Sequence, residues 1–308
     1  MARAICCTRS WRNPAGRRRT ARRTCWPTSG EPGRAAARSE DHADRCPLVR
    51  VVLGVGYRGQ SYQGWQSQQS GNTVQDKLEG ALARFADGPL RTVCAGRTDA
   101  GVHALNQVVH LDTPMDRADS SWVRGTNRFL PPDIAVQWCL LKDDTFHARY
   151  GAIGRRYVYV LLESAVRPAV EAGSVGWSFR PLDGDAMRSA ARVLLGEHDF
   201  SAFRSAECQA TTPVKTLRAI TISRRGAYWR FEFDANAFLH HMVRNLMGSL
   251  LAVGAGTRSE GWLIDVLASK DRALAAPTFP ADGLYFVGPY YDAVHAIPDR
   301  TAAMDWLP

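Results

Sequence analysis

Residues 95–104 combine the side chains that could carry out chemistry without a bound cofactor. They read Ala-Gly-Arg-Thr-Asp-Ala-Gly-Val-His-Ala. The Asp99 carboxylate could act as a nucleophile or move a proton. Arg97 would point the same way if the backbone is extended, and Gly96 and Gly101 permit tight turns and the close approach of a ligand. An Arg–Asp pair that only ties down a turn is the alternative, and the segment alone leaves both open.

Residues 236–248 form a second segment with candidate functional side chains, because two histidines and an arginine lie among apolar residues. Their apolar side chains follow helical spacing and predict a helix over residues 238–253. His240 and Arg244 are four residues apart and would share a face outside the apolar stripe. An arginine on such a helix needs a partner, and Asp99 is our candidate. His240 and His241 raise the alternative of a metal site, but adjacent helical side chains diverge by about 100°, so we predict no metal.

Two aromatic segments could contact unpaired bases. Residues 57–68 interleave Tyr and Trp with Gln, Ser and Arg, which suits stacking on bases and recognition of their edges. The alternative is that Tyr62 and Trp65 pack on the core. In residues 155–159, strand alternation places Arg156 opposite Tyr157, so these residues read as an amphipathic strand and not as one basic patch.

The elements that must position these groups mix helices and strands without strict β-α-β alternation. This pattern favours an α+β fold with an antiparallel sheet. The predicted strands cover residues 51–57, 90–95, 105–111, 134–141, 156–162, 217–224, 228–235 and 284–290. The predicted helices cover residues 73–86, 121–129, 185–195, 238–253 and 261–268.

Composition limits the classes of function. The chain has 308 residues, of which 45% are apolar and 22% charged, as in a globular protein. Its net charge of +9 is carried mostly by residues 1–46, which hold eleven Arg and four acids; residues 47–308 are nearly neutral. A nucleic-acid site in the body would therefore be a local patch. No apolar run approaches the roughly 20 residues of a membrane span.

The cysteine spacing and the composition of the N-terminal segment lead to two further predictions. Cys94, Cys139 and Cys208 show no C-x-x-C spacing, which argues against a zinc site or a disulfide framework and favours a reducing cytoplasm. Residues 1–46 lack helical or strand periodicity. We predict a disordered Arg-rich extension there, which a start site chosen too early would also explain. A basic RNA-binding arm is the alternative.

Taken together, the segments resemble the tRNA pseudouridine synthase A (TruA) family. The Ala-Gly-Arg-Thr-Asp-Ala-Gly-Val-His motif is highly specific, and the other matching segments follow in family order across roughly residues 50–290. They are residues 57 and 62–68, 95–104, Phe-His-Ala-Arg at 146–149, 155–159, Leu-Gly-Glu-His-Asp-Phe at 195–200, 236–248 and Gly-Leu-Tyr at 283–285.

The resemblance implies an isomerase that converts uridine to pseudouridine at tRNA positions 38, 39 and 40, in the anticodon stem-loop. It implies two similar α+β halves around a central antiparallel sheet with a basic cleft. We place an N-terminal catalytic half at residues 47–147, a C-terminal half at 148–292 and a tail at 293–308. The resemblance further implies a homodimer that binds tRNA. The isomerisation adds no outside atom and involves no redox change, so we predict no cofactor. The cysteine usage, the histidine spacing and the apolar runs described above predict a cytoplasmic protein without a metal or a membrane.

The resemblance also assigns roles to single residues. Asp99 would be the nucleophile, and Arg97 would enter the RNA helix as the target base flips out. Tyr157 would stack on that base and could assist proton transfer, and Arg244 would pair with Asp99. Two alternatives stay open at this point: an RNA-binding module without catalysis, and an Asp/His hydrolase that uses Asp99 and His103. The hydrolase is disfavoured because no G-x-S-x-G elbow is present.

Overall fold

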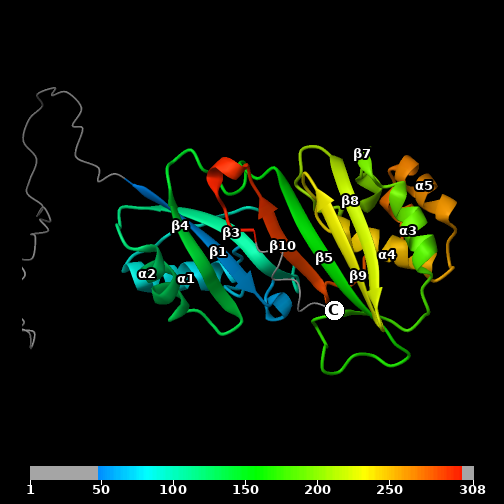
Figure 1. Cartoon of the computed structure of the whole chain (residues 1–308), viewed down its shortest axis with the longest axis horizontal. Coiled ribbons are helices and arrows are strands. Elements are labelled where there is room, and N and C mark those ends of the chain that lie inside the picture. The colour runs from blue at the N-terminus through cyan, green and yellow to red at the C-terminus, as the bar shows by residue number, and fades with distance from the viewer. Residues whose placement is uncertain (1–47, 300–308) are drawn as a thin grey trace, which may run out of the picture. The chain divides into compact units, whose positions relative to one another are not determined.

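The computed structural model describes residues 48–299, so the predicted extension over residues 1–46 and residues 300–308 of the predicted tail lie outside the described part. The described chain forms one ten-stranded sheet with the order β4-β1-β3-β10-β5-β9-β8-β7, in which β2 pairs with β3 and β6 with β5 (Figure 1). The strands are β1 (Val49–Tyr57), β2 (Val93–Cys94), β3 (His103–Thr113), β4 (Ile134–Lys142), β5 (Gly154–Glu163), β6 (Gly176–Ser178), β7 (Gly196–Asp199), β8 (Val214–Arg225), β9 (Tyr228–Ala235) and β10 (Leu284–Tyr290).

The helices group at the two ends of this sheet. Figure 1 shows α1 and α2 beside β1 and β4, and α3, α4 and α5 beside β8 and β9. Their bounds are α1 (Val74–Ala86), α2 (Asp119–Asn127), α3 (Gly184–Arg192), α4 (Met242–Gly254) and α5 (Glu260–Ser269). Short 3-10 turns lie at η1 (Gly59–Ser61), η2 (Ser201–Phe203), η3 (Arg272–Leu274) and η4 (Ala293–His295). No helix among residues 48–299 is long and apolar enough to cross a membrane.

Strand pairing places the last strand at the centre of the sheet. β10 is antiparallel to β5, with Phe286 opposite Tyr157, and parallel to β3, with Tyr285 opposite His103. β5 and β6 form the other parallel pair, and the remaining pairs are antiparallel. β10 therefore joins the two ends of the sheet, and it lies next to the predicted site residue Tyr157 on β5.

Two apolar cores fill the space between the helices and one face of the sheet. One core packs α1 and α2 on β1, around residues such as Leu53 and Leu78. The other packs α3, α4 and α5 on β5 and β9, around residues such as Phe231 and Leu246. Tyr157 packs against both cores, so both groups of helices cover the same face of the sheet. The α+β fold class predicted from the sequence is confirmed, whereas its division into two halves and its basic cleft stay predictions.

One predicted strand is shorter than expected because a side chain replaces its strand partner. The sequence predicts a strand over residues 90–95, but the strand that pairs with β3 covers only Val93–Cys94, followed by one hydrogen bond from Ala95 N–H to the Val108 carbonyl at 2.9 Å. The main-chain N–H of Thr92 instead donates to the Glu79 carboxylate of α1 at 2.8 Å, and the Thr92 hydroxyl donates to the same oxygen at 3.0 Å. The short strands β6 and β7 were missed, since neither spans enough residues to show a period.

The predicted helix over residues 238–253 begins four residues late, at Met242. His241 has φ 62° and ψ 2°, in the left-handed region, and cannot continue a right-handed helix. The preceding backbone is already bonded elsewhere: Ser205 N–H donates to the His240 carbonyl, and His240 N–H donates to Cys208 Sγ. This displaced start changes where both histidines point.

Candidate active site

The segment from Gly96 to Val102 is held in place by hydrogen bonds to the turn at residues 57–68. Trp65 N–H donates to the Thr98 carbonyl at 3.0 Å, and the Thr98 hydroxyl shares a 2.7 Å hydrogen bond with the Tyr57 hydroxyl. Gly101 has φ 83°, which glycine adopts without strain. Asp99 therefore follows a residue that is bonded through both its main chain and its side chain.

Gly64 lets this turn approach the segment closely. Its φ is 86°, and a Cβ at this position would lie 2.8 Å from the Thr98 carbonyl oxygen. A larger residue would therefore push against the backbone next to Asp99. The turn at residues 57–68 and the segment at residues 97–99 therefore pack directly against each other, and the turn holds the backbone at Asp99 in place.

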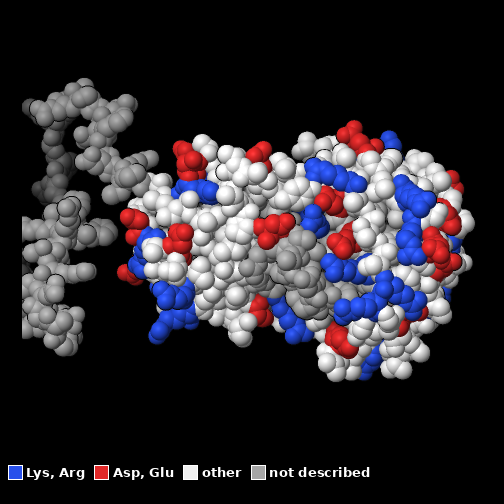
Figure 2. Space-filling view, in the orientation of Figure 1, with Lys and Arg blue, Asp and Glu red and all other residues white. Residues whose placement is uncertain are grey.

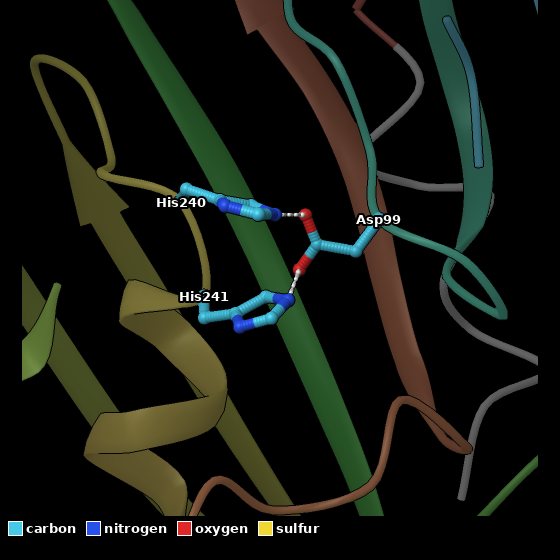
Figure 3. A group of neighbouring side chains, drawn as sticks. All are labelled: Asp99, His240 and His241. Atoms are coloured by element: carbon cyan, nitrogen blue, oxygen red, sulfur yellow. Dashed lines mark ion pairs between the residues drawn. The ribbon is translucent and has the colours of Figure 1, made fainter. Parts of the chain in front are cut away.

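Three side chains surround the Asp99 carboxylate: His240 and His241, which directly precede α4 and are drawn in Figure 3, and Arg244 in the first turn of α4. His240 Nε2 lies 3.3 Å from Oδ1 and His241 Nε2 lies 3.6 Å from Oδ2. Arg244 Nη1 lies 3.7 Å from the same Oδ2, as the sequence predicted for Arg244. Arg244 also donates from Nε to the Phe279 carbonyl at 2.8 Å, which fixes its guanidinium. Both carboxylate oxygens thus face groups that can carry positive charge.

The left-handed backbone at His241 brings the two imidazoles to one side. Inside a regular helix the two side chains would diverge, as the sequence predicted. Instead the ring centroids of His240 and His241 are 4.1 Å apart. Our prediction that they diverge was wrong, and the sequence carries no pattern that signals a left-handed histidine.

These contacts favour the ionised form of Asp99. Burial alone would raise its pKa, but the contact with His240 and the charges of His241 and Arg244 outweigh burial and hold the pKa below its usual range. Asp99 in turn raises the pKa of His240, through their direct contact and its negative charge, against the effect of burial. The pKa of His241 is lowered, mainly by burial. The site therefore holds a carboxylate that stays charged although its side chain is only 19% exposed.

The side chains of Asp99, His240 and His241 have donor atoms within 4.8 Å of one another, and no other such group occurs among residues 48–299. A metal ion would need the negative charge of Asp99, which Arg244 already balances at 3.7 Å. We therefore assign the imidazoles as partners of the carboxylate.

Tyr157 lies on β5 beside this carboxylate and between two aromatic rings. Its ring centroid is 5.1 Å from that of Phe238 and 5.0 Å from that of Phe286. Burial and then the charge of Asp99 raise the pKa of Tyr157 far above its ordinary value. Tyr157 thus offers an aromatic surface and a hydroxyl that keeps its proton.

Arg97 does not contact Asp99. It is exposed, and its Nη1 donates to the Gln209 side chain at 3.3 Å. The interpretation of an Arg–Asp pair that closes a turn is therefore wrong within the described structure. Arg97 is the predicted site residue that the structure does not bring against the carboxylate.

The aromatic turn at residues 57–68 is part of the core. Tyr62 is 7% exposed and Trp65 is 1% exposed, and both belong to the core under α1. The Tyr62 hydroxyl donates to the Asp133 carboxylate at 2.6 Å. The alternative that these rings pack inward is correct, and their role is to support Asp99.

Surface charge on the face shown in Figure 2 is mixed in sign. Lys and Arg side chains gather at the end of the molecule with β8 and β9, and Asp and Glu lie among them. Arg218 on β8, for example, lies 3.6 Å from Asp234 on β9. This face does not present a continuous basic stripe, in agreement with the near-neutral composition of residues 47–308.

The arrangement supplies an ionised carboxylate, groups that can carry the balancing positive charge and an aromatic surface beside it. A carboxylate of this kind can attack an electron-poor carbon or move a proton. His103 of the alternative hydrolase points elsewhere: its Nδ1 accepts from Gly59 N–H, and its Nε2 lies 2.8 Å from the Gly173 carbonyl. His103 is thus a structural group that connects three segments, and a hydrolase pairing with Asp99 is not formed.

Similarity to known proteins shows the family of the chain. Residues 55–151 and 190–292 match the model of a family described as tRNA pseudouridine synthase. A tRNA pseudouridine synthase A of Methylibium petroleiphilum is 71% identical over 260 residues, and one of Polaromonas naphthalenivorans is 65% identical over 264. Each match covers 84% of this chain and the whole of the relative. The predicted resemblance is confirmed, and the chain belongs to the tRNA pseudouridine synthase family.

Proposed function

We propose that Asp99 is the nucleophile in the isomerisation of uridine to pseudouridine in the anticodon stem-loop of tRNA, at the three positions that the resemblance implies. The observation that carries this proposal is the Asp99 carboxylate, which is covered yet kept ionised by His240, His241 and Arg244. The reaction breaks the N1–C1′ bond of uridine and joins C5 to C1′. No outside atom is added and no redox change occurs, so the chain's own residues suffice.

The other predicted residues have roles that follow from their surroundings. The target base must leave its stack, which costs a few kcal/mol. Tyr157 offers a ring on which the extruded uracil stacks, and Arg97 is exposed and able to enter the gap in the RNA helix. Arg244, together with His240 and His241, keeps Asp99 ionised.

The proposal also covers the oligomeric state, the cellular location, the need for a cofactor and the division of the chain into halves. We propose that the protein is a cytoplasmic homodimer that needs no cofactor, with a catalytic half at residues 47–147 and a second half at 148–292. The position of β10 between β3 and β5 supports a site built from both halves. Sedimentation of the protein with and without tRNA tests the dimer.

Incubation with unmodified tRNA followed by mapping of pseudouridine tests the activity. We expect modification by the parent protein and none by Asp99→Asn, which keeps the shape of the side chain but removes its charge. Asp116→Asn, at an exposed carboxylate, is the matched control and keeps full activity. If the parent protein binds tRNA without changing it, the RNA-binding module without catalysis is the correct interpretation. Turnover by Asp99→Asn would exclude Asp99 as the nucleophile.

A further inference from the structure

The proposed reaction must move one proton in each turnover. In uridine C5 carries a hydrogen and N1 is bonded to C1′, whereas in pseudouridine N1 carries the hydrogen and C5 is bonded to C1′. A proton therefore leaves C5 and another arrives at N1. The group that does both works best if it can gain and lose a proton near neutral pH.

Few groups around Asp99 can do this. Arg244 and Arg97 carry guanidinium groups, which do not release protons in proteins. Tyr157 is flanked by Phe238 and Phe286, and both burial and Asp99 oppose loss of its proton. Burial lowers the pKa of His241, which makes His241 less ready than His240 to hold a proton. His240 is the remaining candidate, since imidazole is the side chain that ordinarily changes charge in this range.

We infer that His240 carries this proton, and that the charge of Asp99 decides when His240 releases it. The inference rests on the proposed function. Its geometric basis is the 3.3 Å contact between His240 Nε2 and Asp99 Oδ1, together with a His240 side chain that is still 32% exposed and can meet a bound base. His240 is therefore in direct contact with the group whose charge changes during the reaction.

The steps balance in atoms and protons. Asp99 attacks C1′, an O–C1′ bond forms, and the N1–C1′ electron pair leaves with the uracil. Asp99 is now an uncharged ester, so it no longer holds the proton on His240, which passes to N1. After the base turns, C5 attacks C1′ and the ester bond breaks, which restores the carboxylate. The C5 proton then returns to His240, whose proton affinity has risen again.

The groups around His240 fit this role. Asp99 faces it from the segment before β3, and Glu207 and Cys208 face it from the loop after η2; all three favour its protonated form. His241 lies beside it on its own segment. The backbone of His240 is fixed by Ser205 N–H at 3.0 Å and by Cys208 Sγ at 3.4 Å. The ring therefore stays opposite Asp99 when the charge of the carboxylate changes.

His240→Gln is the sharpest test, because glutamine keeps a side-chain N–H donor for Asp99 but cannot carry a proton. We expect unchanged tRNA affinity and a single-turnover rate about 10²- to 10⁴-fold lower. With deuterium at C5 of the target uridine, the parent should show a small isotope effect and His240→Gln a large one. The parent rate should also fall as the pH rises through the His240 pKa, and this limb should be absent in His240→Gln.

Two further variants distinguish proton transfer by His240 from a purely structural role of its side chain. Free imidazole should restore turnover to His240→Ala, whereas sodium chloride at equal ionic strength should not. His241→Asn keeps a residue suited to the left-handed backbone, and we expect its C5 isotope effect to match that of the parent.

If His240→Gln turns over within threefold of the parent with an unchanged isotope effect, His240 does not carry the proton. The same holds if imidazole fails to rescue His240→Ala that binds tRNA normally. Turnover by Asp99→Asn would instead refute the proposed function itself.

Discussion

The contact between Arg244 and Asp99 should appear as a measurable coupling free energy. At 3.7 Å and an effective dielectric constant of about 20, the attraction between the two charges is about 4 to 5 kcal/mol before solvent screening. The side chains are 17% and 19% exposed, and two imidazoles still face the carboxylate when Arg244 is removed. We therefore expect a net coupling of about 1 to 3 kcal/mol.

A double-mutant cycle with Asp99→Asn and Arg244→Met measures this coupling. The free energy of unfolding of the four proteins is obtained from urea titrations at pH 7. Arg244→Met also loses the hydrogen bond to the Phe279 carbonyl, but this loss occurs in both variants that carry the change and cancels. The cycle thus isolates the pair.

The pH dependence gives the sign of the effect. The folded-state pKa of Asp99 lies below the ordinary value of 3.8, so its contribution to stability is present above pH 3.8 and is lost as the pH falls through the folded-state pKa. The control is a cycle with Arg91→Met and Glu79→Gln. That pair is closer, at 3.0 Å, but Arg91 is 86% exposed, so we expect a coupling below about 1 kcal/mol. A coupling below about 0.5 kcal/mol for Asp99 and Arg244 would refute our account of the site.

Three other predictions concern Gly64, Tyr157 and His110. Gly64→Ala should lower the free energy of unfolding by about 1 to 3 kcal/mol, because its φ is 86° and its Cβ would meet the Thr98 carbonyl; Gly80→Ala in α1, which meets nothing within 4 Å, should be neutral or stabilising in the same thermal melt. Tyr157→Phe should keep more turnover in a tritium-release assay than Asp99→Asn if stacking dominates; an equally deep loss would assign a chemical role to the hydroxyl. Burial lowers the pKa of His110 to about 4, so stability should fall by up to about 3 kcal/mol between pH 6.5 and 4, and His110→Asn should remove that slope in urea titrations.

Much of the fold follows from local patterns in the sequence. The strand at residues 284–290 and the helix that begins after Thr73 have the predicted bounds, because apolar periodicity and the Thr73 cap act over a few neighbouring residues. The motif at residues 95–104 identified Asp99, and the need for a charge partner identified Arg244.

The histidine pair could not be predicted in the same way. His240 and His241 read as helical because their neighbours are apolar at helical spacing. Their actual positions depend on Ser205 and Cys208, which bond the backbone at His240 from more than 30 residues away in the sequence. Tertiary contacts of this kind leave no local period.

The position of β10 in the middle of the sheet, although it comes late in the sequence, has a consequence for the synthesis of the protein. β10 is the last strand among residues 48–299, yet it separates β3 from β5, so until Leu284–Tyr290 leaves the ribosome β3 and β5 each expose the part of the edge that pairs with β10. Exposed edges invite pairing with other chains. A chain that stops before residue 284 would contain Asp99, Tyr157 and Arg244 without the strand that sets them side by side. The candidate active site is therefore completed only after β10 has been made, so a chain interrupted before residue 284 should be inactive and prone to aggregate.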